Sequence, residues 1–110
     1  MDSNHYVVHT TVDSRERADA MATMMVNEGI AACVHIVPIQ SVYRWKGAVE
    51  HADEFRLEAK TTSEHVDQLM EFVRGAHPYD TPEIIALPIV KGDTRYLEWL
   101  ENEINPTEEH

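Results

Sequence analysis

Residues 31–60 read AACVHIVPIQSVYRWKGAVEHADEFRLEAK, and this stretch decides the fold. Residues 41–46 and residues 54–60 each alternate between polar and apolar side chains, which is typical of a strand with one covered face. The Lys46-Gly47-Ala48 segment between them predicts the turn of a hairpin. The two arms are much longer than an ordinary strand of about 5–6 residues. We therefore expect a hairpin that extends beyond the helices covering the rest of the sheet.

The remaining strands are shorter. Residues 5–12 are rich in Val, Thr and Tyr and predict a first strand, and residues 83–90 predict a last one. Pro38 falls inside the first hairpin arm and has no N–H for a strand ladder. It predicts either a bend that interrupts this arm or a position at the edge of the sheet.

Helices are predicted between these strands. Asp13 and Glu16 resemble a capping box, and the apolar residues that follow have helical spacing. A second capping box at residues 61–64 predicts a helix that ends at Gly75, and Asp93 is expected to cap a short last helix. The resulting order, βαββαβ with a C-terminal helix, predicts a ferredoxin-like α/β sandwich of the α+β class.

Length and composition indicate one domain. The chain has 110 residues, 43% of them hydrophobic and 26% charged, so residues 1–110 are expected to form a single globular unit. No apolar run approaches the roughly 20 residues of a membrane span. The single cysteine, Cys33, cannot form an internal disulfide, and we expect a cytoplasmic protein.

The charge balance excludes some partners. Twenty acidic and nine basic residues give a formal net charge of −11, which repels phosphate backbones and anionic lipids. We expect no binding to nucleic acid or to membranes. The long hairpin arms present unpaired edges, which need a second chain. An oligomer follows. Tyr43 and Trp45 form either a surface on which a ligand stacks or, as we expect, packing between subunits.

Several segments, in this order along the chain, resemble the CutA divalent-cation-tolerance family. They are Ala31-Ala32-Cys33-Val34, Ser41-Val42-Tyr43-Arg44-Trp45-Lys46-Gly47, Lys60-Thr61-Thr62, His77-Pro78-Tyr79-Asp80-Thr81-Pro82-Glu83-Ile84-Ile85 and Tyr96-Leu97-Glu98-Trp99-Leu100. The resemblance implies a homotrimer of ferredoxin-like protomers whose long strands pair across subunits. It also implies a role in tolerance of copper and other divalent metal ions.

The resemblance points to two candidate metal ligands, His9 and His77. Bacterial members are associated with copper binding through a cysteine on the first strand and two adjacent residues that end at the histidine before Pro-Tyr. Here His9 stands in the place of that cysteine, and Ala76 and His77 take the adjacent positions. Two imidazoles are too few for a tight site for Cu²⁺ or another divalent cation. Water, Asp80, Glu83 or a neighbouring chain would complete the ligand shell.

Each candidate has a structural alternative. His77 either binds metal or forms local hydrogen bonds that hold its proline-braced loop. His9 is either a ligand or a hydrogen-bonded histidine in the interior or at an interface. Cys33 and His35 share one face of a strand and form either half a soft-metal site or ordinary strand packing.

Three functions are compatible with these patterns. The first is a homotrimeric protein that binds divalent metal ions and acts in metal tolerance without catalysis, since no nucleophile–base set or glycine-rich phosphate loop is present in the sequence. The second is a trimeric small-molecule sensor similar to the nitrogen-regulatory PII proteins. The third is a structural interaction module.

Overall fold

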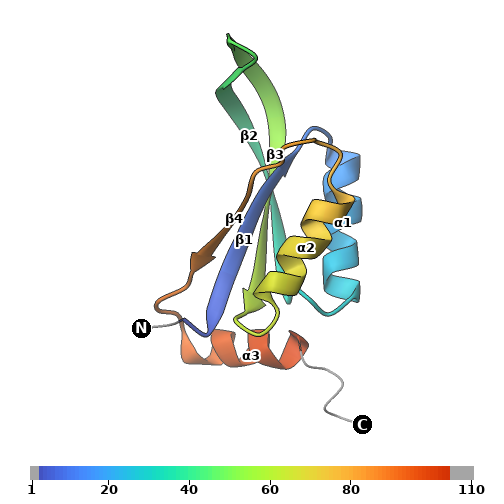
Figure 1. Cartoon of the computed structure of the whole chain (residues 1–110). Coiled ribbons are helices and arrows are strands. Elements are labelled where there is room, and N and C mark those ends of the chain that lie inside the picture. Colours follow the sequence, from blue (N-terminus) through green and yellow to red (C-terminus); the bar gives the residue numbers. More distant parts are fainter. Residues whose placement is uncertain (1–2, 105–110) are drawn as a thin grey trace.

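A four-stranded antiparallel sheet with two helices packed on one face forms the body of the protein (Figure 1). The computed structural model describes residues 3–104. The elements in chain order are β1 His5–Val12, α1 Arg15–Asn27, β2 Cys33–Trp45, β3 Ala48–Thr62, α2 Val66–Ala76, β4 Ile84–Pro88 and α3 Thr94–Ile104. The strand order is β2-β3-β1-β4, and each neighbouring pair is antiparallel. The predicted ferredoxin-like α+β sandwich is confirmed, including its long hairpin and C-terminal helix.

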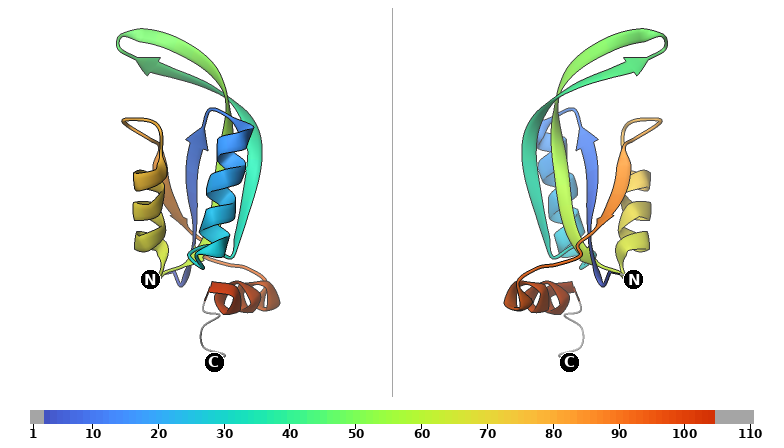
Figure 2. Two further views of the ribbon diagram at one scale, coloured as in Figure 1. Left: turned by 90° about the vertical axis from the view of Figure 1, so that its right-hand side faces the viewer. Right: turned by 90° about the vertical axis from the view of Figure 1, so that its left-hand side faces the viewer.

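The core lies between the sheet and the helices α1 and α2, which cover the same face (Figure 2). Leu57 and Ala59 of β3 point into it, as their alternation predicted, and the four apolar residues that give α1 its stripe are all buried. They are Ala18, Met21, Ala22 and Met25. Because neither α1 nor α2 covers the opposite face, we call that side the open face. Alternate residues of each strand, including His9, Glu54 and Ile85, belong to it.

Helix α3 crosses the end of the sheet that lies far from the hairpin turn (Figure 1). Leu100 and Ile104 are buried there with Ala32 in a second, smaller apolar cluster. His5 of β1 makes a 2.6 Å contact with Glu101 from its Nε2 atom. The backbone N–H of Tyr96 donates to the side chain of Asp93, so Asp93 caps α3 as predicted.

The β2–β3 hairpin extends beyond the rest of the sheet. Its pairing runs from Cys33 opposite Lys60 to Trp45 opposite Ala48, whereas β1 reaches only as far as Phe55. Lys46 and Gly47 have positive φ angles of 51° and 83°, which suits a two-residue hairpin turn. Pro38 lies within an unbroken β2, so the predicted bend is wrong. The edge position is correct, because β2 is an outer strand.

Two helix starts differ from the sequence expectation. Ser14, with extended backbone, caps α1 by accepting the N–H of Arg17, so Asp13 is not the cap. The predicted box at residues 61–64 is also wrong, because Thr61 and Thr62 still pair with β1 and α2 begins only at Val66. Gly75 lies inside α2, which ends one residue later. None of the helices in residues 3–104 is both long and apolar enough to cross a membrane.

Candidate functional site

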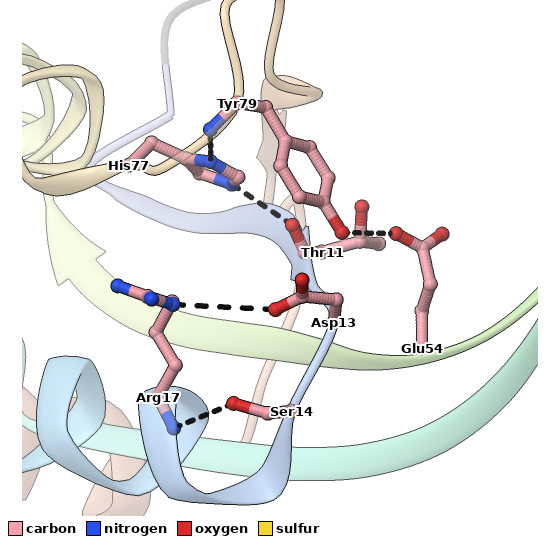
Figure 3. A network of polar contacts seen from close by, with 7 residues as sticks. All are labelled: Thr11, Asp13, Ser14, Arg17, Glu54, His77 and Tyr79. Carbon is pink, nitrogen blue, oxygen red and sulfur yellow. Dashed lines mark hydrogen bonds and ion pairs between the residues drawn. The ribbon is translucent and has the colours of Figure 1, made fainter.

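The loop of residues 77–83 joins α2 to β4 and meets β1 through the ring of His77 (Figure 3). The Nε2–H of His77 donates to the carbonyl of Thr11 at 2.8 Å, and the N–H of Tyr79 donates to Nδ1 at 3.2 Å. A carbonyl only accepts and a backbone N–H only donates, so the two contacts select the neutral ring with its proton on Nε2. The β1–β4 ladder ends at Thr10 opposite Ile84, and His77 therefore supplies a partner for the next residue of β1.

Burial lowers the pKa of His77 below its ordinary value. The Thr11 carbonyl opposes this effect, and the nearby positive charge of Arg17 adds to it. A proton on Nδ1 would remove the acceptor for the N–H of Tyr79. A metal ion on either nitrogen would likewise replace one of the two hydrogen bonds, so metal binding at His77 and the present loop geometry compete.

The lowered pKa leads to a first expected result. As the pH falls, the unfolded chain takes up the proton before the folded chain does, so the neutral ring stabilises the fold fully above about pH 6.5. This stability is lost as the pH falls through the lower folded-state pKa. Replacing His77 by Gln is expected to flatten the decline in the free energy of unfolding between about pH 7 and pH 5. Denaturant melts along that range test it, and His51→Gln, at an exposed position of β3, should leave the decline unchanged.

His9 lies on the open face of the sheet and is half-buried. Its cross-strand neighbours are Glu58 on β3 and Ile85 on β4, and Glu58 also stands opposite His35 on β2. His9 and His77 therefore have different neighbours, although His77 bonds to β1 only two residues further on. Within residues 3–104, no group of three or more His, Cys, Asp or Glu side chains is placed to hold a metal ion. The assignment of His9 and His77 as ligands stays a prediction.

Cys33 and His35 share the open face of β2, as the alternation predicted, but they have different neighbours. Burial raises the pKa of Tyr96 on α3, and Cys33 adds to this shift, so the half-buried thiol lies close to that phenol. The exposed ring of His35 accepts from Lys60 Nζ at 2.9 Å. The two side chains are thus engaged with separate partners.

Glu54 of β3 is the central polar residue at the hairpin end of the open face. Only 9% of it is exposed. Ser41 Oγ of β2 donates to its Oε1 at 2.7 Å, and the hydroxyl of Tyr79 donates to its Oε2 at 2.8 Å. Burial raises the pKa of Tyr79, and the hydrogen bond to Glu54 raises it further, so the phenol stays protonated and remains a donor. Glu54 thereby connects the hairpin to the loop after α2 (Figure 3).

A cavity of about 560 Å³ opens beside this network. Its hairpin side is formed by Tyr43, Trp45 and Glu54, and its loop side by Tyr79, Asp80 and Glu83. The volume lies within the range of about 300–1,000 Å³ that is usual for small-molecule sites. The hairpin and the loop of a single chain form this cavity.

Residues 6–103 match a protein family described as CutA1 divalent ion tolerance protein. The chain belongs to this family. A divalent-cation tolerance protein CutA from Thermus thermophilus is 48% identical over 95 residues, which cover 86% of this chain and 92% of that protein. The chloroplastic protein CutA of Arabidopsis thaliana is 48% identical over 97 residues, covering 87% of this chain but 53% of its own length. The chain therefore spans about half the length of some curated relatives.

Solved structures of CutA proteins have the same fold. The CutA structure from Synechococcus elongatus superposes with a TM-score of 0.91 at 36% identity and covers 94% of this chain and 92% of its own. The CutA1 structure from Oryza sativa gives 0.87 at 45% identity, with 93% and 94% of the two chains covered. The family resemblance expected from the sequence is confirmed.

Glu54 belongs to none of the sequence motifs that indicated a site in this CutA1-family chain. The contact between Glu54 and Ser41 could have been predicted from the sequence. A two-residue turn at Lys46-Gly47 sets the hairpin register, which makes Ser41 a diagonal neighbour of Glu54 on one face. The contact from Tyr79 depends on the path of the loop after α2 and has no such signal.

Proposed function

We propose that this CutA1-family chain acts in divalent-cation tolerance as a homotrimer that binds Cu²⁺ or another divalent cation without catalysing a reaction. The main support is the match of residues 6–103 to a family described by divalent ion tolerance, together with a Thermus thermophilus relative of that name. The formal net charge of −11 attracts cations to the surface. We place the protein in the cytoplasm because its single cysteine forms no internal disulfide.

Exposed apolar surface supports the homotrimer. Ile85 and Leu87 of β4 lie on the open face and are 44% and 41% exposed, and Val49 on the projecting hairpin is 56% exposed. In the described part of the chain, the hairpin beyond Phe55 pairs only with itself, which leaves both of its outer edges free. Free edges of this length and apolar patches are features that natural proteins cover with another chain.

We assign His9 and His77 as the metal ligands. Water, Asp80, Glu83 or a neighbouring subunit would complete the ligand shell. Imidazole nitrogen suits Cu²⁺ and Zn²⁺. Binding at His77 requires the ring to exchange a hydrogen bond with Thr11 or Tyr79 for the metal. We therefore expect moderate affinity that is coupled to movement of the loop.

Titration of the full chain with Cu²⁺ and Zn²⁺ tests this assignment. Affinity should fall on replacing His9 or His77 by Ala and should decline below about pH 6, where imidazole becomes protonated. Cys33→Ser, tested without oxygen, serves as the control and is expected to bind like the unchanged chain. Binding that fades entirely as salt rises would indicate attraction by the diffuse negative field alone. Loss of metal binding only in Cys33→Ser would show that Cys33 and His35 hold the metal instead.

A trimeric small-molecule sensor similar to the PII proteins is the second candidate. The cavity of about 560 Å³ beside Glu54 favours it, because its size suits a small ligand. A nucleotide that raises the melting temperature at sub-millimolar concentration would place this function first. The absence of basic side chains from the cavity wall, as described within residues 3–104, argues against a phosphate-bearing ligand.

A further inference from the structure

Glu54 is a buried carboxylate, and its hydrogen-bond partners within residues 3–104 are neutral. Its two oxygens accept hydrogen bonds from Ser41 and Tyr79, both of which donate through hydroxyl groups. The ion pairs found among residues 3–104 do not include Glu54, although it is only 9% exposed. Burying a carboxylate without an opposite charge is costly. A cation in the adjoining space would offset that cost.

The cavity next to Glu54 has the lining that an organic cation requires. Three of its lining residues are aromatic, Tyr43, Trp45 and Tyr79, and Asp80 and Glu83 add negative charge. The cavity wall in the described structure includes no Lys, Arg or His. Aromatic faces attract ammonium groups, most strongly where water is partly excluded. Such rings also provide apolar surface for the body of a ligand.

The Trp45 ring already lies close to a cation. Lys46 Nζ is 5.8 Å from the centre of the Trp45 ring. This lysine belongs to the hairpin turn, and the ion pairs of residues 3–104 do not join it to Glu54. The contact shows that an ammonium group lies within cation–π distance of the Trp45 ring.

A bare metal ion fits this cavity less well. Tight sites for metal ions use three or more converging protein ligands, and residues 3–104 contain no such group of His, Cys, Asp or Glu side chains. The volume of about 560 Å³ is also far larger than one ion needs. We propose that the cavity binds a small organic cation, an ammonium compound with an aromatic or aliphatic body, and that Glu54 provides the counter-charge. All of the lining residues belong to one chain; His9 and His77 are not among them, whereas Asp80 and Glu83 are shared with the ligand shell proposed above for the metal.

Three probes of matched shape test the proposal on the full chain at about 0.15 M salt, where diffuse attraction is largely screened. They are 2-phenylethylamine, which is a cation, 2-phenylethanol, which is neutral, and 3-phenylpropionate, which is an anion. Calorimetry and chemical-shift changes are expected to show saturable binding of the amine. The alcohol should bind about 10-fold or more weakly, as expected when a contact to a charged group is lost, and the anion should not bind.

Two matched variants show which carboxylate is responsible for binding the amine. Glu54→Gln keeps the size of the side chain and its capacity for hydrogen bonds, and it is expected to weaken amine binding by about 10- to 100-fold. Glu98→Gln removes the same charge from an exposed position on α3 and should have no effect. Equal binding of the three probes, absence of amine binding, or equal losses in the two variants would overturn the proposal. Should Glu54→Gln fail to fold, the comparison of probes on the unchanged chain still decides.

Discussion

The double substitution Ile85→Asp/Leu87→Asp is expected to convert the protein from the proposed trimer to a monomer at micromolar concentration. Both side chains belong to β4 on the open face and are 44% and 41% exposed in the single chain. New carboxylates there remain hydrated in a monomer, so the fold itself should tolerate them. In the proposed trimer they would be buried between subunits, at a cost of several kcal/mol for each charge.

Light scattering measures the mass, and circular dichroism reports whether the protomer is folded. The matched control is Met24→Asp, which introduces the same charge at a residue that is 49% exposed on α1, on the other side of the sheet. This control should remain trimeric. A trimer that survives the double substitution would show that the open face of β4 is not the interface. A monomeric unchanged chain would refute the trimer itself.

Leu57→Ala is expected to lower the free energy of unfolding by about 2–5 kcal/mol, the range for truncating a buried leucine. Leu57 is fully buried on the helix-facing side of β3, and it stands opposite Thr10 of β1 and Ile36 of β2. Truncation would leave a cavity at the centre of the sheet, and both the lost transfer free energy and the cavity contribute to the cost.

Val26→Ala is the control because Val26 is an aliphatic residue of α1, away from the open face and from the hairpin that the trimer is proposed to cover. It is 45% exposed in the single chain. We expect it to cost less than about 1 kcal/mol. The two variants should be compared by denaturant unfolding at one chain concentration, because assembly stabilises the folded state in a concentration-dependent way. Equal losses would mean that the core is not centred on Leu57.

Much of the fold could be predicted because strand alternation and helical spacing are local signals. Leu57 and Ala59 were expected to face inward and are buried, and the apolar stripe of α1 is buried at each expected position. The residues at which the helices begin were harder to predict. Asp13 and Ser14 are both good capping residues, and only the extended backbone of Ser14 shows which one accepts the first free N–H. Thr61 resembled a cap but is retained by β3, because its pairing with Tyr6 continues the ladder.

The candidate site was less predictable, since it depends on contacts between segments that are distant in the sequence. The rigid loop around His77 was expected from its prolines. That the ring bonds to the carbonyl of Thr11 could not be expected, because it requires knowing where β4 ends beside β1. Glu54 was treated as one polar residue of an alternating strand. Its role became visible only when the hairpin register and the loop placed Ser41 and Tyr79 against it.

Native mass spectrometry of the full chain with and without added Cu²⁺ measures assembly and bound metal in one spectrum, so it tests the proposed trimer and its metal binding together. We expect a complex of three 12.6 kDa chains that gains copper, with less copper retained when His9 and His77 are both replaced by Ala. A monomer, or a trimer whose copper content is the same in the unchanged chain and the double variant, would contradict this expectation.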